Sequence, residues 1–248
     1  MSQSEMYADN PYGQFGRSVA EATPDVRVDF IRRTYTHLAA AIYAFIAVEW
    51  ALFKLLPVEE LVNSLFAFRF GWLAVLGGFM LVSVIADRWA RSDTSIGIQY
   101  LGLTVYVLAE AIVFLPLLYL AQGMTVSVPG IGAVSAIAVA GVTTLAIVGV
   151  LTAIVWISRA DFSFLRSALV VGSIGAFALI VMSIFMGWNL GVWFSVGMVV
   201  FACMAILYNT SNVLHYYQPT QHVAAALALF ASVALLFWYI LQLFMSRD

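Results

Sequence analysis

The side chains best suited to chemistry in this sequence stand inside apolar segments, where polar groups are rare. Glu110 lies in the middle of the apolar stretch YVLAEAIVF, and Glu49 lies two-thirds of the way through an earlier one. A carboxyl group inside a membrane span is costly, so it is a functional hypothesis by default, usually for ion or proton movement. Tyr106 and Gln99 share roughly one helical face with Glu110, which predicts a polar stripe. For Glu49, an ion pair with Lys54 or Arg69 near the outer surface is the alternative interpretation.

A second polar cluster closes another apolar run, in the stretch ILYNTSNVLHYY (206–217). Four of its side chains recur at i, i+3, i+4 and i+7, the spacing of one helical face: Tyr208, Ser211, Asn212 and His215. Asn209 lies one position off this face. The stripe could line an ion or water path. Alternatively, its members form interhelical hydrogen bonds, which contribute about 0.6 to 2 kcal/mol each.

Enzymatic and metal chemistry find little support in the residue pattern. The stretch GSIG (172–175) resembles the serine motif of an intramembrane protease, but no histidine in a later span could act as its base. His215 and His222 flank a proline turn and lack a third ligand nearby, so no zinc site is predicted. No phosphate loop or dinucleotide motif is present. We therefore expect no enzyme, no metal and no cofactor.

Composition defines the class of protein. Of the 248 residues, 63% are hydrophobic and only 10% are charged, more apolar surface than a water-soluble core can bury. The net charge of −2 favours no nucleic-acid partner, so the expected surrounding is a lipid bilayer. Residues 1–29 are polar, without the short apolar core of a signal peptide, and are expected to form a tail. Residues 30–248 are expected to form one transmembrane domain.

Seven apolar runs approach or exceed the roughly 20 residues that cross a bilayer as a helix. They are continuously apolar rather than alternating, which favours helices over a membrane barrel. The predicted fold is an all-α bundle of seven transmembrane helices. The runs are His37–Leu56, Phe70–Ala86, Gln99–Ala121, Ile131–Ile157, Leu165–Met186, Gly191–Leu214 and Val223–Met245.

Basic residues predict the orientation, since Lys and Arg concentrate on the cytoplasmic side. With the N-terminus inside, eight of the eleven fall in cytoplasmic segments, and Lys54, Arg69 and Arg247 remain outside. The N-terminus is therefore predicted to be cytoplasmic and the C-terminus external. No transit peptide or retention signal is visible, which favours the bacterial inner membrane.

Three stretches together suggest a family. They are FIRRTYTHL (30–38) before the first span, LTAIVWISRADFSFLR (151–166) between the fourth and fifth, and LYNTSNVLHYY (207–217) at the end of the sixth. With seven spans and Glu110 in the third, the sequence resembles the Bax inhibitor family, also called the transmembrane Bax-inhibitor-motif family. The resemblance runs from Phe30 to the C-terminus, and RADFS and LY-x-TSN are its most specific parts.

The resemblance implies a bundle with the seventh helix at its centre. Characterised relatives are pH-sensitive calcium leak channels, suppressors of cell death in eukaryotes, and bacterial partners that restrain a membrane-anchored AAA protease. In the calcium-leak members, one aspartate in the sixth helix and another in the seventh share protons. An arginine of the second helix acts as a latch on the first.

This sequence departs from that pattern. The two aspartate positions correspond to Asn209 and Ser232, and Arg69, the possible latch, stands at the outer mouth of the second span. An amide and a hydroxyl cannot share a proton as two carboxylates do. We expect a calcium or proton-linked leak with a weakened or lost pH gate. The alternative is a non-conducting modulator of a membrane-anchored protease or stress response. The polar path is predicted to comprise Glu110, Asn209, Asn212, Ser232, Tyr106 and Glu49.

Overall fold

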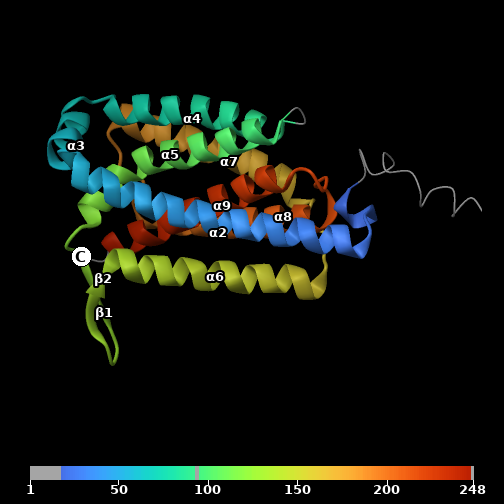
Figure 1. The fold of residues 1–248 in the computed structure, drawn as a ribbon. Coiled ribbons are helices and arrows are strands. Elements are labelled where there is room, and N and C mark those ends of the chain that lie inside the picture. Colours follow the sequence, from blue (N-terminus) through green and yellow to red (C-terminus); the bar gives the residue numbers. More distant parts are fainter. Residues whose placement is uncertain (1–17, 93–94, 247–248) are drawn as a thin grey trace, which may run out of the picture.

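The computed structural model describes residues 18–92 and 95–246, and these form a bundle of long helices lying side by side (Figure 1). Seven helices of the described chain are long and apolar enough to cross a membrane, which confirms the predicted number of spans. They are α2 (Pro24–Leu55), α4 (Gly71–Ala90), α5 (Ile96–Ala121), α6 (Ala136–Ser158), α7 (Leu165–Met186), α8 (Gly191–His215) and α9 (His222–Met245).

Four short elements join or precede the spans: η1 (Val19–Glu21), α3 (Val58–Ala67), β1 (Thr125–Val128) and β2 (Gly132–Ser135). The two strands form an antiparallel hairpin, so the fourth span begins at Ala136 and the predicted start at Ile131 was wrong. Hydropathy alone missed the second strand because Ile131, Ala133 and Val134 continue the apolar run of the span that follows. The glycines at its tip, Gly130 and Gly132, have φ of 80° and 97°, which side chains with a Cβ rarely adopt.

The first span also differs from its predicted bounds. α2 begins at Pro24, so residues 24–29, predicted to belong to the tail, are helical. Proline suits a first helical turn, because the N–H it lacks has no partner there. Asp29 then pairs with Arg32 at 2.6 Å and with Arg33 at 2.7 Å, the i+3 and i+4 spacings that support a helix. Residues 1–17 of the predicted tail lie outside the described residues.

Burial is concentrated in two helices, α5 and α9. α9 packs against α2, α4, α5, α6 and α8, whereas α7 packs mainly on α8 and has no buried residue. A cluster of rings joins the inner helices. Phe114 of α5 lies 5.1 Å from Phe45 of α2 and 4.9 Å from Trp238 of α9, between ring centroids. The central place of the seventh span among all the others stays a prediction.

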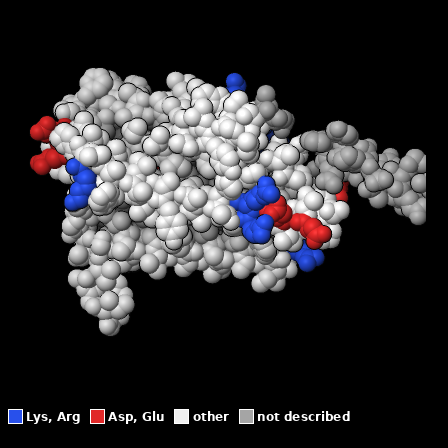
Figure 2. Space-filling model, viewed as in Figure 1, with Lys and Arg blue, Asp and Glu red and all other residues white. Residues whose placement is uncertain are grey.

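Charge is segregated along the bundle. Because the helices alternate in direction, the starts of α2, α5, α7 and α9 and the ends of α4, α6 and α8 share one end, here called the basic end. The opposite end carries Lys54, Arg69, α3 and the hairpin. Figure 2 shows charged side chains at the two ends of the visible face and none along its middle. The described arginines of the basic end are Arg27, Arg32, Arg33, Arg88, Arg91, Arg159 and Arg166.

This arrangement predicts opposite sidedness for the two ends of the described chain. In a Cys203→Ala background, a cysteine at Glu21 should react from the cytoplasm and one at Ser246 from outside, because the basic end is retained inside. Labelling with membrane-impermeant maleimide in intact and opened cells measures this. Reaction of both cysteines from the same side would contradict seven crossings.

Candidate functional site

Glu110 lies in the interior of the bundle, on the face of α5 that meets α4 and α9. Its side chain is 7% exposed, and the phenol of Tyr106, one turn earlier on the same face, interacts with its carboxyl group. The other oxygen, Oε2, has no partner. The Tyr106 ring lies between Phe79 of α4 and Phe230 of α9, at 5.7 and 6.1 Å. Glu110 therefore has the Tyr106 phenol as its polar neighbour, and one of its oxygens has no partner.

Glu49 is the second buried carboxyl group. It is 6% exposed, and neither of its oxygens has a hydrogen-bond partner. The alternative ion pair with Lys54 or Arg69 is not formed, since the ion pairs of the described residues all join an arginine to an aspartate at the basic end. Arg69 instead donates to the Phe185 carbonyl of α7 at 2.8 Å. This contact joins Arg69 to the fifth span. The latch implied by the family resemblance would instead join the second span to the first span.

The two carboxyl groups flank the ring cluster. Phe114 follows Glu110 by one turn, Phe45 precedes Glu49 by one turn, and the two rings touch. α2 and α5 both start at the basic end, so Glu110 lies on the basic side of these rings and Glu49 on the opposite side. Aromatic packing thus separates the two acids along the bundle axis.

Asn209 and Ser232 meet between α8 and α9. Asn209 Nδ2 donates to Ser232 Oγ at 2.8 Å, and Ser232 Oγ donates to the Ala228 carbonyl of its own helix at 3.0 Å. The structure therefore brings together the two positions that the family resemblance paired. The contact consists of an amide and a hydroxyl, with no titratable proton.

α9 separates this neutral pair from Glu110. Phe230 faces Tyr106, and Ser232 lies two residues later, about 200° further around the helix. The residues predicted to line one path thus form separate groups on opposite sides of α9. Asn212 is half-buried, and its carbonyl accepts the backbone N–H groups of Tyr216 and Tyr217, which closes the end of α8.

The loop after α6 is docked on the end of α8. Ser211 is fully buried, accepts the Phe162 N–H at 3.0 Å and donates to the Ala160 carbonyl at 3.4 Å. The Tyr216 hydroxyl donates to Asp161, and this hydrogen bond lowers the pKa of the Asp161 carboxyl group below its usual value. RADFS and the end of LY-x-TSN-x-x-HYY, singled out separately in the sequence, are thus two sides of one contact. The sequence suggested that Ser211 lines an ion path or bonds to a neighbouring helix. In the structure it bonds to this loop instead.

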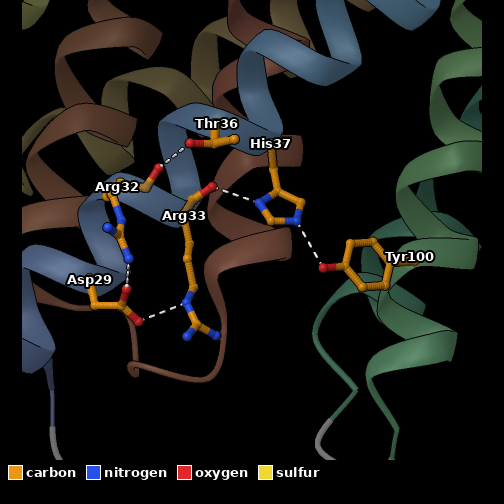
Figure 3. A network of polar contacts seen from close by, with 6 residues as sticks. All are labelled: Asp29, Arg32, Arg33, Thr36, His37 and Tyr100. Carbon is orange, nitrogen blue, oxygen red and sulfur yellow. Dashed lines mark hydrogen bonds and ion pairs between the residues drawn. The ribbon is translucent and has the colours of Figure 1, made fainter.

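A further polar network joins α2 to α5 at the basic end (Figure 3). His37 Nδ1 donates to the Arg33 carbonyl at 2.6 Å, and Nε2 lies 2.9 Å from the Tyr100 hydroxyl. The His37 ring lies 5.0 Å from that of His222, whose buried Nδ1 has no partner. No local sequence pattern predicts the contact of His37 with His222, because these residues are far apart in the chain.

Seven apolar helices with buried carboxyl groups define a polytopic membrane protein. The sequence matches the family described as inhibitor of apoptosis-promoting Bax1 over residues 27–248. The chain therefore belongs to the Bax inhibitor family. No curated protein gives a significant match to the sequence.

The docked loop yields a stability prediction. Ser211→Ala should lower the free energy of unfolding by about 1–3 kcal/mol, because it leaves the Phe162 N–H without its partner at a buried side chain. Tyr216→Phe should cost less than about 1 kcal/mol, because the carboxylate it contacts is exposed to water. Unfolding in detergent micelles measures both. Equal losses would contradict the assignment of Ser211 as the anchor.

The same contact predicts a pH dependence with a definite sign. The pKa of Asp161 is lowered in the folded state, so its contribution to stability is present above the unfolded-state pKa, about 3.9. That contribution disappears as the pH falls through the lower folded-state value. In the Tyr216→Phe variant, the free energy of unfolding should therefore fall less on acidification than in the wild type. Near pH 7, it should depend on pH as little as it does in the wild type.

Proposed function

We propose that the protein is a non-enzymatic, proton-linked leak pathway for cations in the cytoplasmic membrane of a bacterium, with Glu110 and Glu49 as its protonation sites. One observation carries this proposal: two nearly fully buried carboxyl groups lie inside membrane-spanning helices without a cationic partner. Ionisable groups in such positions mark ion or proton pathways.

The chemistry follows from charge balance. An ionised carboxylate in a low-dielectric interior needs a compensating cation or hydrogen-bond donors. The Tyr106 phenol is the polar group beside Glu110, and neither oxygen of Glu49 has a hydrogen-bond partner. Release of a proton from either acid therefore favours entry of a cation or water, and binding of a proton opposes it. The ring cluster between them, which includes Phe45 and Phe114, is the proposed barrier.

The neutral pair between α8 and α9 supports a weakened gate. Asn209 and Ser232 are already hydrogen-bonded to each other and to the Ala228 carbonyl. They offer a cation only dipoles, whereas calcium prefers several oxygen ligands that include carboxylates. This pair therefore holds α8 against α9, and the protonation-dependent part of the function falls to the acids of α2 and α5.

Ion flux through purified protein in liposomes tests the proposal. Glu110→Gln and Glu49→Gln should each reduce the pH-dependent part of monovalent cation flux about tenfold, a change of about 1.4 kcal/mol in the barrier. The neutral amide keeps the side-chain shape but cannot release a proton. Glu60→Gln is the matched control, because that carboxyl group is exposed in α3.

Two outcomes would contradict the proposal. Unchanged flux at every pH in both variants would make the acids structural. A folded wild-type protein that conducts no ions would favour the alternative, a non-conducting modulator of a membrane-anchored protease.

A gain-of-function substitution tests the neutral pair separately. The wild type should show little calcium flux between about pH 6 and 8, the range where a coupled carboxyl pair can titrate. Asn209→Asp with Ser232→Asp should create pH-sensitive calcium flux, because the 2.8 Å contact would then join two carboxyl groups. Each single substitution should do less, since one acid lacks its coupled partner. Robust pH-gated calcium flux in the wild type would contradict this reasoning.

A further inference from the structure

A furrow opens between α2 and α6 near the basic end, away from the proposed pathway. Its volume is about 430 Å³, within the range of small-molecule sites. One wall is a single face of α2, with residues spaced at i, i+3, i+4 and i+7, and the other is one turn of α6. The lining residues are Val28, Ile31, Arg32, Tyr35, Thr152 and Trp156.

Helix packing explains why the furrow exists. α2 and α6 each pack against α9 but not closely against one another, which leaves a gap above α9. Tyr35 and Trp156 meet across it, with ring centroids 5.8 Å apart and the indole N–H 3.4 Å from the Tyr35 hydroxyl. Val28 is 65% exposed and Trp156 41% exposed, so the furrow is open toward the lipid-facing side of the helices.

The furrow combines apolar walls with positive charge at one end. The Arg32 side chain is 75% exposed, and Asp29 engages one of its terminal nitrogens at 2.6 Å (Figure 3). A guanidinium has five N–H donors, so Arg32 keeps donors for a further anion. Asp29 is shared with Arg33, and Arg159 is exposed three residues after Trp156. The charged groups on the first three turns of α2 and on the loop after α6, an excess of one positive charge, are Arg27, Arg32, Arg33, Arg159, Asp25, Asp29 and Asp161.

We propose that this furrow is a binding site for an anionic phospholipid. One acyl chain lies between α2 and α6, and the headgroup phosphate binds the guanidinium of Arg32. Guanidinium groups match the geometry of phosphate oxygens, and basic pockets between membrane helices bind anionic headgroups. Trp156 and Tyr35 suit the boundary between headgroup and acyl chain, where amphipathic rings concentrate. A free phosphate would use Arg32 alone and leave the apolar walls uncovered.

Native mass spectrometry of the detergent-purified protein tests the site. With identical acyl chains, phosphatidylglycerol should remain bound at lower lipid concentration than phosphatidylcholine. Arg32→Gln should weaken phosphatidylglycerol binding about fivefold, the effect of one basic residue at a membrane surface. Arg88→Gln, an exposed arginine at the same end of α4, should leave binding unchanged.

A second pair of variants tests whether the lipid occupies the furrow itself, beside Arg32. Val28→Trp should fill the furrow and weaken binding of both lipids, whereas Val142→Trp, at a valine of α6 that is 70% exposed, should not. Both positions are exposed, so neither substitution disturbs the core, and retention of the wild-type unfolding temperature verifies the fold.

Several results would overturn the proposal. Equal retention of the two lipids would contradict recognition of the headgroup by its charge. Equal effects of Arg32→Gln and Arg88→Gln would contradict the role of Arg32 in that recognition. Displacement of lipid by equimolar glycerol phosphate would indicate a phosphate site without an acyl-chain furrow. A dimer that Val28→Trp disrupts would show that a helix of a second copy occupies the furrow. Each of these outcomes leaves the ion-flux test of Glu110 and Glu49 unaffected.

Discussion

The absence of water inside a bilayer is the constraint on which this structure depends. Backbone N–H and C=O groups at that depth must bond within the chain, so each long apolar run becomes a helix. The hairpin, α3 and the loop after α6 all lie at the ends of the bundle. Side chains obey the same constraint less strictly. Several hydroxyl groups in the spans donate to a carbonyl of the preceding turn, as Thr144 does to Ala140 and Ser232 to Ala228.

Glu49 and Glu110 are the two carboxyl groups among the described buried side chains that have an oxygen without a hydrogen-bond partner. The other buried polar atoms without a partner belong to Thr34, Gln99, Thr210 and His222. Asn209 and Ser232 occupy the positions where the family resemblance places two aspartates, yet their hydrogen bonds are satisfied locally. The two glutamates keep oxygens without partners in the same low-dielectric interior. A buried group that folding leaves unsatisfied costs about 1–3 kcal/mol. Stability alone therefore gives no reason to retain these acids, which is the basis of the proposed proton-linked role.

The basic end is organised as a single polar layer. Ser211 holds the loop after α6, His37 joins Tyr100 and His222, and Asp29 joins two arginines. η1 is tied to the same layer, since the Val19 N–H donates to the Tyr217 carbonyl at 2.8 Å. These contacts connect helices at the water boundary, where polar groups can be paired without crossing lipid. The furrow between α2 and α6 ends in this layer, which places arginine side chains beside an apolar groove.

The sequence by itself determined the class of protein, the number of spans and the exceptional acids, because hydropathy and charge are local properties that persist in any fold. The motifs of the fourth-to-fifth connection and the sixth span also indicated the family before their contact was visible. Only the tertiary structure decided that Ser211 holds the Phe162 backbone, that His37 meets His222, and that α9 separates Glu110 from Asn209. These relations depend on the rotation and depth of each helix in the bundle. Both are set by packing between segments distant in the chain, which no local pattern records.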